Sequence, residues 1–154
     1  MIRVSTLLFV LLLGAGCKDT GIDPDEALKE ADKITNARLN FNKLPGKWTF
    51  TGYLKDKSVT ASGEATLEFT ESESANVLKV GGRAFVNFYG STVSYKESNE
   101  PVSTIEIIAP ISTTKMSGPP DLLKAESDFL SNLKNVTKFT VENTELKLYV
   151  GEPA

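Results

Sequence analysis

The spacing of hydrophobic residues changes at Pro45-Gly46, where a run of two-residue periodicity begins. Apolar and polar side chains alternate over 47–54 and, most regularly, over 64–70. This alternation is typical of half-buried β-strands. Glycine marks turns where short apolar runs stop. Under this reading, further strands are predicted at 78–80, 84–89, 93–95 and 105–109, with Gly81-Gly82 and Gly90 as breaks between them.

A helix is predicted to follow these strands. Pro119-Pro120-Asp121 suits a helix start, because proline is favoured at the first helical position. Asn135 is the expected end. Apolar residues then recur on one helical stripe, at Leu122, Phe129, Leu130 and Leu133.

Two last strands, 136–141 and 144–150, are predicted to form a hairpin with Glu142-Asn143 as its turn. Hairpins therefore dominate the pattern, and one helix interrupts it. A sheet of many short strands tends to curl, and an amphipathic helix can cover its open side. We predict an α+β fold, a strongly curved and partly closed antiparallel sheet of about 7–8 strands with one helix before the last hairpin.

Residues 17–45 are predicted to be a tether that contains one short helix. Asp23-Pro24 is a helix-start signature. Leu28, Ala31 and Ile34 form a thin apolar stripe, and we expect the helix to end before Asn40. A stripe this thin predicts loose docking or fraying.

Cys17, the only cysteine, follows a short apolar segment and three small residues. Arg3 supplies a positive start, the apolar run covers 4–13, and Gly14-Ala15-Gly16 precedes the cysteine. The run is shorter than the ~20 residues that span a membrane. The segment resembles the lipobox of bacterial lipoprotein signal peptides, although Gly14 replaces the usual leucine. The resemblance implies removal of residues 1–16 and acylation of Cys17, for example with palmitate. The alternative is an ordinary secretory signal with an incidental cysteine.

Composition argues against several classes of function. Seventeen basic and 20 acidic side chains give a net charge of −3 without a basic stripe, which argues against nucleic-acid binding. The chain has no histidine, which is the commonest general base and zinc ligand. Because Cys17 is assigned to lipid, Cys–His and Ser–His–Asp chemistry is excluded. We therefore expect no enzyme, metal or cofactor. We also expect a monomer.

Glu126 lies on the apolar stripe of the predicted helix, four residues after Leu122 and three before Phe129. A buried carboxylate is costly unless it accepts hydrogen bonds. The nearest candidate donors in sequence are the hydroxyls and amides of 112–115, or Lys115 itself. We expect a structural tie between the helix and this segment.

These residues resemble the META domain (HslJ-like) family over about residues 46–150. The resemblance rests on 110–116, Glu126 and the closing strand, and on 82–87 followed by Gly90. Phe85 replaces the second glycine of the family pattern, and the two common cysteines are absent. The resemblance implies these structural pattern positions: Trp48, Gly82, Asn87, Thr114, Met116 and Glu126. Asn87 is expected to satisfy backbone groups at a turn or bulge, and Met116 to fill the core.

The resemblance implies a small envelope module, residues 46–154, without an established enzymatic activity. We expect a lipid-anchored protein on the periplasmic face of the outer membrane, engaged in envelope stress or in protein interactions, including envelope or secretion proteins. The alternative is a carrier or pilotin-like chaperone that holds a lipid or apolar peptide in the concavity of the sheet.

Overall fold

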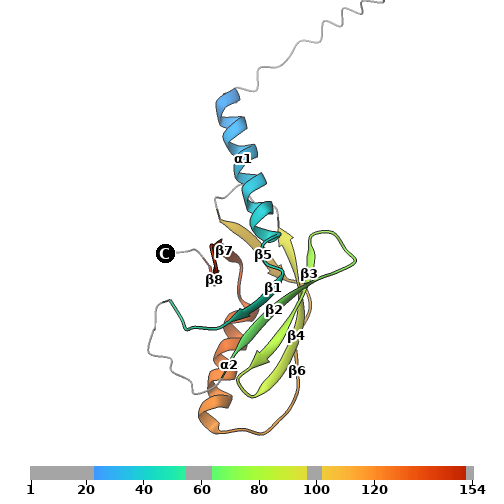
Figure 1. Ribbon diagram of the computed structural model, residues 1–154, viewed down its shortest axis with the longest axis vertical. Helices are drawn as coiled ribbons and strands as arrows, with labels where there is room; N and C mark the ends of the chain where they lie inside the picture. The colour runs from blue at the N-terminus through green and yellow to red at the C-terminus, as the bar shows by residue number, and fades with distance from the viewer. Residues whose placement is uncertain (1–22, 55–63, 97–101, 152–154) are drawn as a thin grey trace, which may run out of the picture.

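The structure, a computed structural model, describes residues 23–54, 64–96 and 102–151. It contains two helices and an eight-stranded antiparallel sheet that curves into a nearly closed barrel (Figure 1), so the α+β prediction is confirmed. The elements are α1 Pro24–Phe41, β1 Gly46–Thr49, β2 Thr66–Glu71, β3 Val77–Ala84, β4 Asn87–Lys96, β5 Ser103–Ile107, β6 Ser112–Thr113, α2 Pro120–Lys134, β7 Lys138–Glu142 and β8 Glu145–Tyr149.

Hairpins build most of the sheet. Its order is β1-β2-β3-β4-β5-β7-β8, and β6 pairs separately with β4. Alternation sends every second side chain to the inside, as in β2, where Leu67 and Phe69 are buried and Glu68 is exposed. The enclosed core is completely shielded at Leu44 and Phe139, so side chains fill the interior of the barrel.

The boundary between β3 and β4 differs from the prediction. Gly81-Gly82 and Gly90 lie inside these strands, whereas 84–89, predicted as one strand, contains the turn between them. Gly81 faces Gly90 across the pair, and a Cβ on Gly81 would lie 2.9 Å from the carbonyl oxygen of Tyr89. The glycines therefore permit close backbone approach rather than turns. The turn itself uses Phe85, which adopts a left-handed φ of 58° with its ring buried.

The first helix is longer and more firmly attached than predicted. Asp23 is its N-cap and Pro24 its first residue, as expected, but it continues through Asn40 to Phe41. Ala37 and Phe41 are buried, and the Ser103 hydroxyl donates to the carbonyl oxygen of Ala37 at 3.2 Å. The last turn of α1 is therefore part of the core, and the prediction of loose docking was wrong for this end of the helix.

Two further boundaries also differ. β1 ends at Thr49 rather than continuing to Leu54. In the last hairpin, Glu142 pairs with Glu145, so the two turn residues are Asn143 and Thr144 rather than Glu142-Asn143. Asn143 adopts φ 53°, a conformation that asparagine tolerates better than most residues.

Candidate functional site

The second helix closes one side of the barrel and positions the residues of the candidate site. Pro120 occupies the first helical turn, and the helix ends at Lys134 with Asn135 as its C-cap, close to the predicted end. Its buried residues are Phe129 and Leu133. Leu122 and Leu130 are half-buried against the same core. The apolar stripe therefore faces the inside of the sheet.

Aromatic rings fill the space between this helix and the sheet. Phe129 contacts Phe50, Phe85 and Tyr89, with ring centroids 5.4, 6.2 and 5.8 Å apart. All three pairs have the edge-on geometry that ring quadrupoles favour. The sheet's concave side is therefore occupied by the protein's own side chains at this point.

Glu126 is one turn before Phe129 and is fastened to the sheet by Asn87. Its Oε2 accepts from the backbone N–H of Asn87 at 2.8 Å, and its Oε1 accepts from the side-chain Nδ2 at 2.9 Å. Asn87 is the first residue of β4 and is buried. The carboxylate therefore receives one donor on each oxygen and joins α2 to the start of β4.

The side-chain oxygen of Asn87 binds the segment that precedes α2. Asn87 Oδ1 accepts from Thr114 Oγ1 at 2.8 Å and from the backbone N–H of Met116 at 2.7 Å. Thr114 Oγ1 also accepts from the backbone N–H of Phe88 at 3.1 Å. We call Asn87, Thr114, Met116 and Glu126 the Asn87 network. It joins three segments that are far apart in the sequence.

This arrangement corrects the expected partner of Glu126. The segment 112–115 was predicted to donate to the carboxylate directly, but Asn87 stands between them. Among the residues that the structure describes, no ion pair joins Lys115 to Glu126. The helix and the segment 112–116 are still connected, because the Asn87 amide donates to Glu126 through its nitrogen and accepts from Thr114 through its oxygen.

Trp48 and Gly82 lie away from this network. Trp48 is half-buried in β1, and its Nε1 donates to the carbonyl oxygen of Leu44 at 2.9 Å. Gly82 lies in β3, where a Cβ would come within 2.2 Å of the carbonyl oxygen of Thr66. Met116 is 44% exposed, so the prediction that it fills the core was wrong. Cys17 lies outside the described residues.

Tyr89 is a buried polar residue that the sequence analysis did not identify. Its hydroxyl donates to the carbonyl oxygen of Thr66 at 2.9 Å, beside the glycine contact. Burial raises the pKa of Tyr89 above its ordinary value, because the phenolate would lose its hydration. The phenol therefore acts as a neutral donor. The available sequence signal for its burial was its place in the nearly continuous apolar run 84–89.

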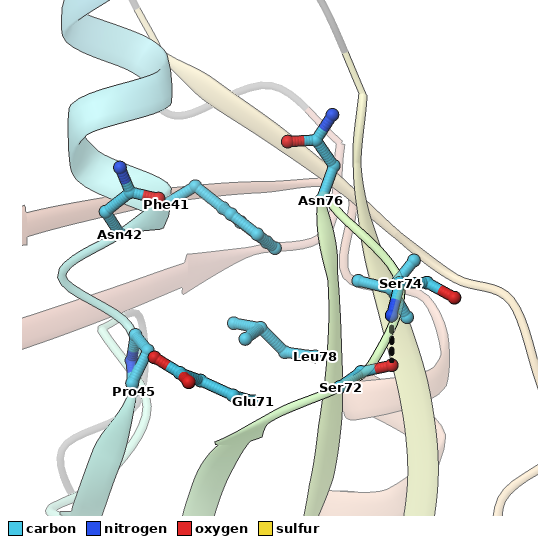
Figure 2. A pocket seen from close by; sticks show the side chains of 9 residues that line it. Phe41, Asn42, Pro45, Glu71, Ser72, Ser74, Asn76 and Leu78 are labelled. Atoms are coloured by element: carbon cyan, nitrogen blue, oxygen red, sulfur yellow. Dashed lines mark hydrogen bonds between the residues drawn. The ribbon is translucent and has the colours of Figure 1, made fainter.

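Two hollows of about 250 Å³ each lie on the described surface. Figure 2 shows the first, where Phe41 and Leu78 form the floor and Glu71 and Ser72 lie at the rim. The second lies over β2 and β3, on the face opposite the core. Its lining residues are Glu68, Thr70, Lys79, Val80, Gly81 and Gly82. Both hollows are polar at their rims and separate from the Asn87 network.

The described residues contain no group of three or more side chains suited to hold a metal ion. Within the same ranges, neither helix combines the length and hydrophobicity needed to cross a membrane.

The comparisons with known proteins identify the family. A family model described as META domain matches residues 40–153. The chain belongs to the META domain family. No curated protein and no solved structure matches it. The match begins in the last turn of α1 and includes the whole Asn87 network, so the polar tie between α2 and β4 lies inside the META domain.

Proposed function

We propose that this META domain protein is a non-enzymatic, lipid-anchored module of the bacterial envelope that acts by binding other proteins. The observation that carries the proposal is the hydrogen bonding of the Glu126 carboxylate. Both of its oxygens accept hydrogen bonds from Asn87, whose own oxygen is occupied by Thr114 and Met116. A general acid or base must reach a substrate proton, whereas both oxygens of this carboxylate are engaged in holding the fold.

The amino-acid inventory supports a binding role. The chain has no histidine, and its single cysteine is the expected lipid-attachment residue. Nucleophilic catalysis uses a base beside the nucleophile. The polar contacts in the Asn87 network instead join side chains to one another and to backbone N–H groups. These observations favour recognition by the surface over chemistry in a cleft.

The lipid anchor is supported by the sequence around Cys17 and by the shape of α1. Two or more acyl chains anchor a protein stably. Figure 1 shows α1 projecting away from the sheet, and its 18 residues correspond to about 27 Å at 1.5 Å per residue. The helix therefore suits a spacer between the anchor and the META domain. A periplasmic position at the outer membrane is part of the proposal.

The carrier alternative receives less support. Ligand pockets of about 300–1,000 Å³ are usual, with mostly apolar linings. The two hollows described above measure about 250 Å³, and both have charged residues in their linings. The space beneath α2 is filled by Phe129 and its ring partners. We therefore place partner recognition on the outside of the protein.

The anchor is tested by Cys17→Ser in the full chain. We expect the substituted protein to leave the membrane fraction and appear in the soluble fraction, because the acyl chains cannot be attached. Fractionation followed by immunoblotting measures this. Continued sedimentation with membranes after a high-salt wash would contradict the anchor.

Protein binding is tested in cells by photo-cross-linking from four exposed apolar positions. Benzoylphenylalanine replaces Leu39, Leu54, Phe88 or Leu123, one at a time; these residues are 51%, 55%, 55% and 38% exposed. We expect discrete protein adducts from at least one position after illumination. An absence of protein adducts from every position would contradict the proposed function.

A further inference from the structure

The outward face of β3 and β4 carries an arrangement that the fold does not require. β3 directs Lys79, Gly81 and Arg83 away from the core, because they alternate with the buried Leu78 and Val80. On β4, the outward residues include Phe88 and Gly90, which alternate with buried Tyr89 and Val93.

Two glycines meet at the centre of this face. Gly81 pairs with Gly90 in the register of β3 and β4, while the next outward pair is Arg83 with Phe88. Without side chains, the glycine pair leaves the backbone open, and the second 250 Å³ hollow lies beside it. The hollow has Glu68 and Lys79 on its walls. The face therefore offers a furrow that can receive a side chain.

Phe88 is a rigid apolar residue on the same face, next to the glycine pair, because it lies two residues before Gly90 and opposite Arg83. The side chain is 55% exposed, although the residue lies in the middle of a hydrogen-bonded region. Its N–H donates to Thr114 Oγ1 at 3.1 Å, and its carbonyl oxygen accepts from the N–H of Thr114 at 3.0 Å. Asn87, the preceding residue, is held by Glu126. A pre-organised exposed aromatic residue suits the centre of a protein interface.

The charge of this face is opposite to that of the chain. Lys79 and Arg83 point outward from β3. Lys47 on β1 also points outward, because it lies opposite the outward-facing Glu68 of β2. Lys47, Lys79, Arg83 and Glu68 together carry a net charge of +2, whereas the whole chain carries −3. The ion pairs among the described residues involve none of the three cations. Lys47 and Lys79 are therefore available to a partner's carboxylates. Arg83 uses its Nε, which donates to the carbonyl oxygen of Phe85 at 2.9 Å, and offers its other guanidinium N–H groups.

We infer that this face, formed by Lys79, Gly81, Arg83, Phe88 and Gly90, docks a segment of a partner protein that carries an apolar side chain flanked by carboxylates. The inference rests on the proposed function and adds the surface and the chemistry of the partner. The furrow receives the apolar side chain beside Phe88, and Lys79 and Arg83 face the carboxylates. Glu68 and the concave furrow favour a shaped peptide segment over a flat anionic membrane.

The test uses the full chain in cells, with benzoylphenylalanine at position 88. We expect an adduct with a protein, and mass spectrometry of the cross-linked peptide should place the photoadduct in an acidic segment beside an apolar residue. Leu39, with a similar exposure of 51% but on α1, is the matched position. Adducts from position 88 should exceed those from position 39 by about tenfold, as expected for a central interface residue.

Two substitutions then test the recognition itself. Lys79→Glu reverses a charge whose side chain makes no ion pair within the described ranges, and we expect about a tenfold loss of the position-88 adduct. Gly90→Ala places a methyl group over the backbone that the glycine pair leaves open. A Cβ at Gly90 would lie 3.7 Å from Ser112 Oγ, an ordinary contact, so the strand should fold normally while the adduct decreases. Lys33→Glu, on the exposed side of α1, is the charge control.

Unchanged melting temperatures for Lys79→Glu and Gly90→Ala show that any loss of adduct comes from the surface. Three outcomes would overturn the inference: adducts from position 88 that contain only lipid, a cross-linked segment that is basic, or adducts that survive both substitutions. Protein adducts that arise only from positions 39, 54 or 123 would also overturn it, yet would leave the proposed function standing.

Discussion

The two helices of this protein attach to the same sheet in different ways. α2 lies against the core through Phe129 and Leu133 and is tied to β4 by Glu126. α1 is longer, but only Ala37 and Phe41 in its C-terminal part are buried. A helix that is an integral part of a domain is held along its length, whereas one that projects from it needs only a firm base. The difference marks α2 as an integral part of the domain and α1 as a projecting helix with a fixed base.

The largest effect is expected where α2 meets the rings of the sheet. Phe129→Ala removes a side chain that is only 8% exposed and contacts three aromatic residues. Replacing a buried phenylalanine by alanine typically costs about 3–5 kcal/mol, because a cavity remains. Urea unfolding monitored by circular dichroism measures the loss. A change below about 1 kcal/mol would mean that α2 is not packed as described.

The polar tie should contribute less than the rings. Glu126→Ala leaves the N–H and Nδ2 of Asn87 without their acceptor, and an orphaned donor costs about 1–3 kcal/mol. The same unfolding experiment applies, with Glu106→Ala on the exposed side of β5 as a control that should be nearly neutral. An unchanged melting temperature for Glu126→Ala would contradict the claim that the hydrogen bonds between Glu126 and Asn87 stabilise the attachment of α2.

A smaller, pH-dependent effect is expected at Tyr89, beneath α2. Burial raises its pKa in the folded protein above the ordinary value of 10.0, so the folded state keeps its proton at a pH where the unfolded state loses it. Stability is therefore fully present below pH 10 and decreases as the pH rises above it. Tyr89→Phe should cost about 1 kcal/mol at neutral pH and make the alkaline decrease shallower. Equal slopes in the two proteins would contradict this role.

The smallest effect is expected on the projecting part of α1. Leu28 is 66% exposed, so Leu28→Ala should change the free energy of unfolding by less than about 0.5 kcal/mol. Phe41→Ala, at the buried base of the same helix, is the matched contrast and should destabilise the domain clearly. Strong destabilisation by Leu28→Ala would show that α1 is packed against the protein along its whole length.

The sequence predicted the parts of the fold that depend on local pattern. Alternation in 64–70 and the stripe of α2 identified their elements, because burial on one face imposes a period. The glycines of β3 and β4 were misleading, since glycine serves turns and close strand contacts equally well and only the pairing decides between them. The left-handed conformation of Phe85 carries no sequence signal of its own.

The base of α1 could have been predicted more fully. Ala37, Phe41 and Leu44 follow one another at helical spacing, and all three are buried. The predicted apolar stripe ended at Ile34, so the docking end of the helix was predicted too early in the sequence. In the Asn87 network, the odd position of Glu126 was visible. Its partner was not, because Asn87 lies 39 residues away in the sequence and only the folded sheet brings the two together.

The claim that Glu126 and Asn87 act as one fastening between α2 and β4 is tested most directly by a double-mutant cycle. Glu126→Ala, Asn87→Ala and the double substitution are compared with the unchanged protein by urea unfolding. We expect a coupling energy of about 0.5–3 kcal/mol, because Asn87→Ala and Glu126→Ala both remove the hydrogen bond from Nδ2 to Oε1, while the backbone N–H of residue 87 is lost as a partner only when Glu126 is replaced. Losses that simply add, with a coupling near zero, would contradict the claim.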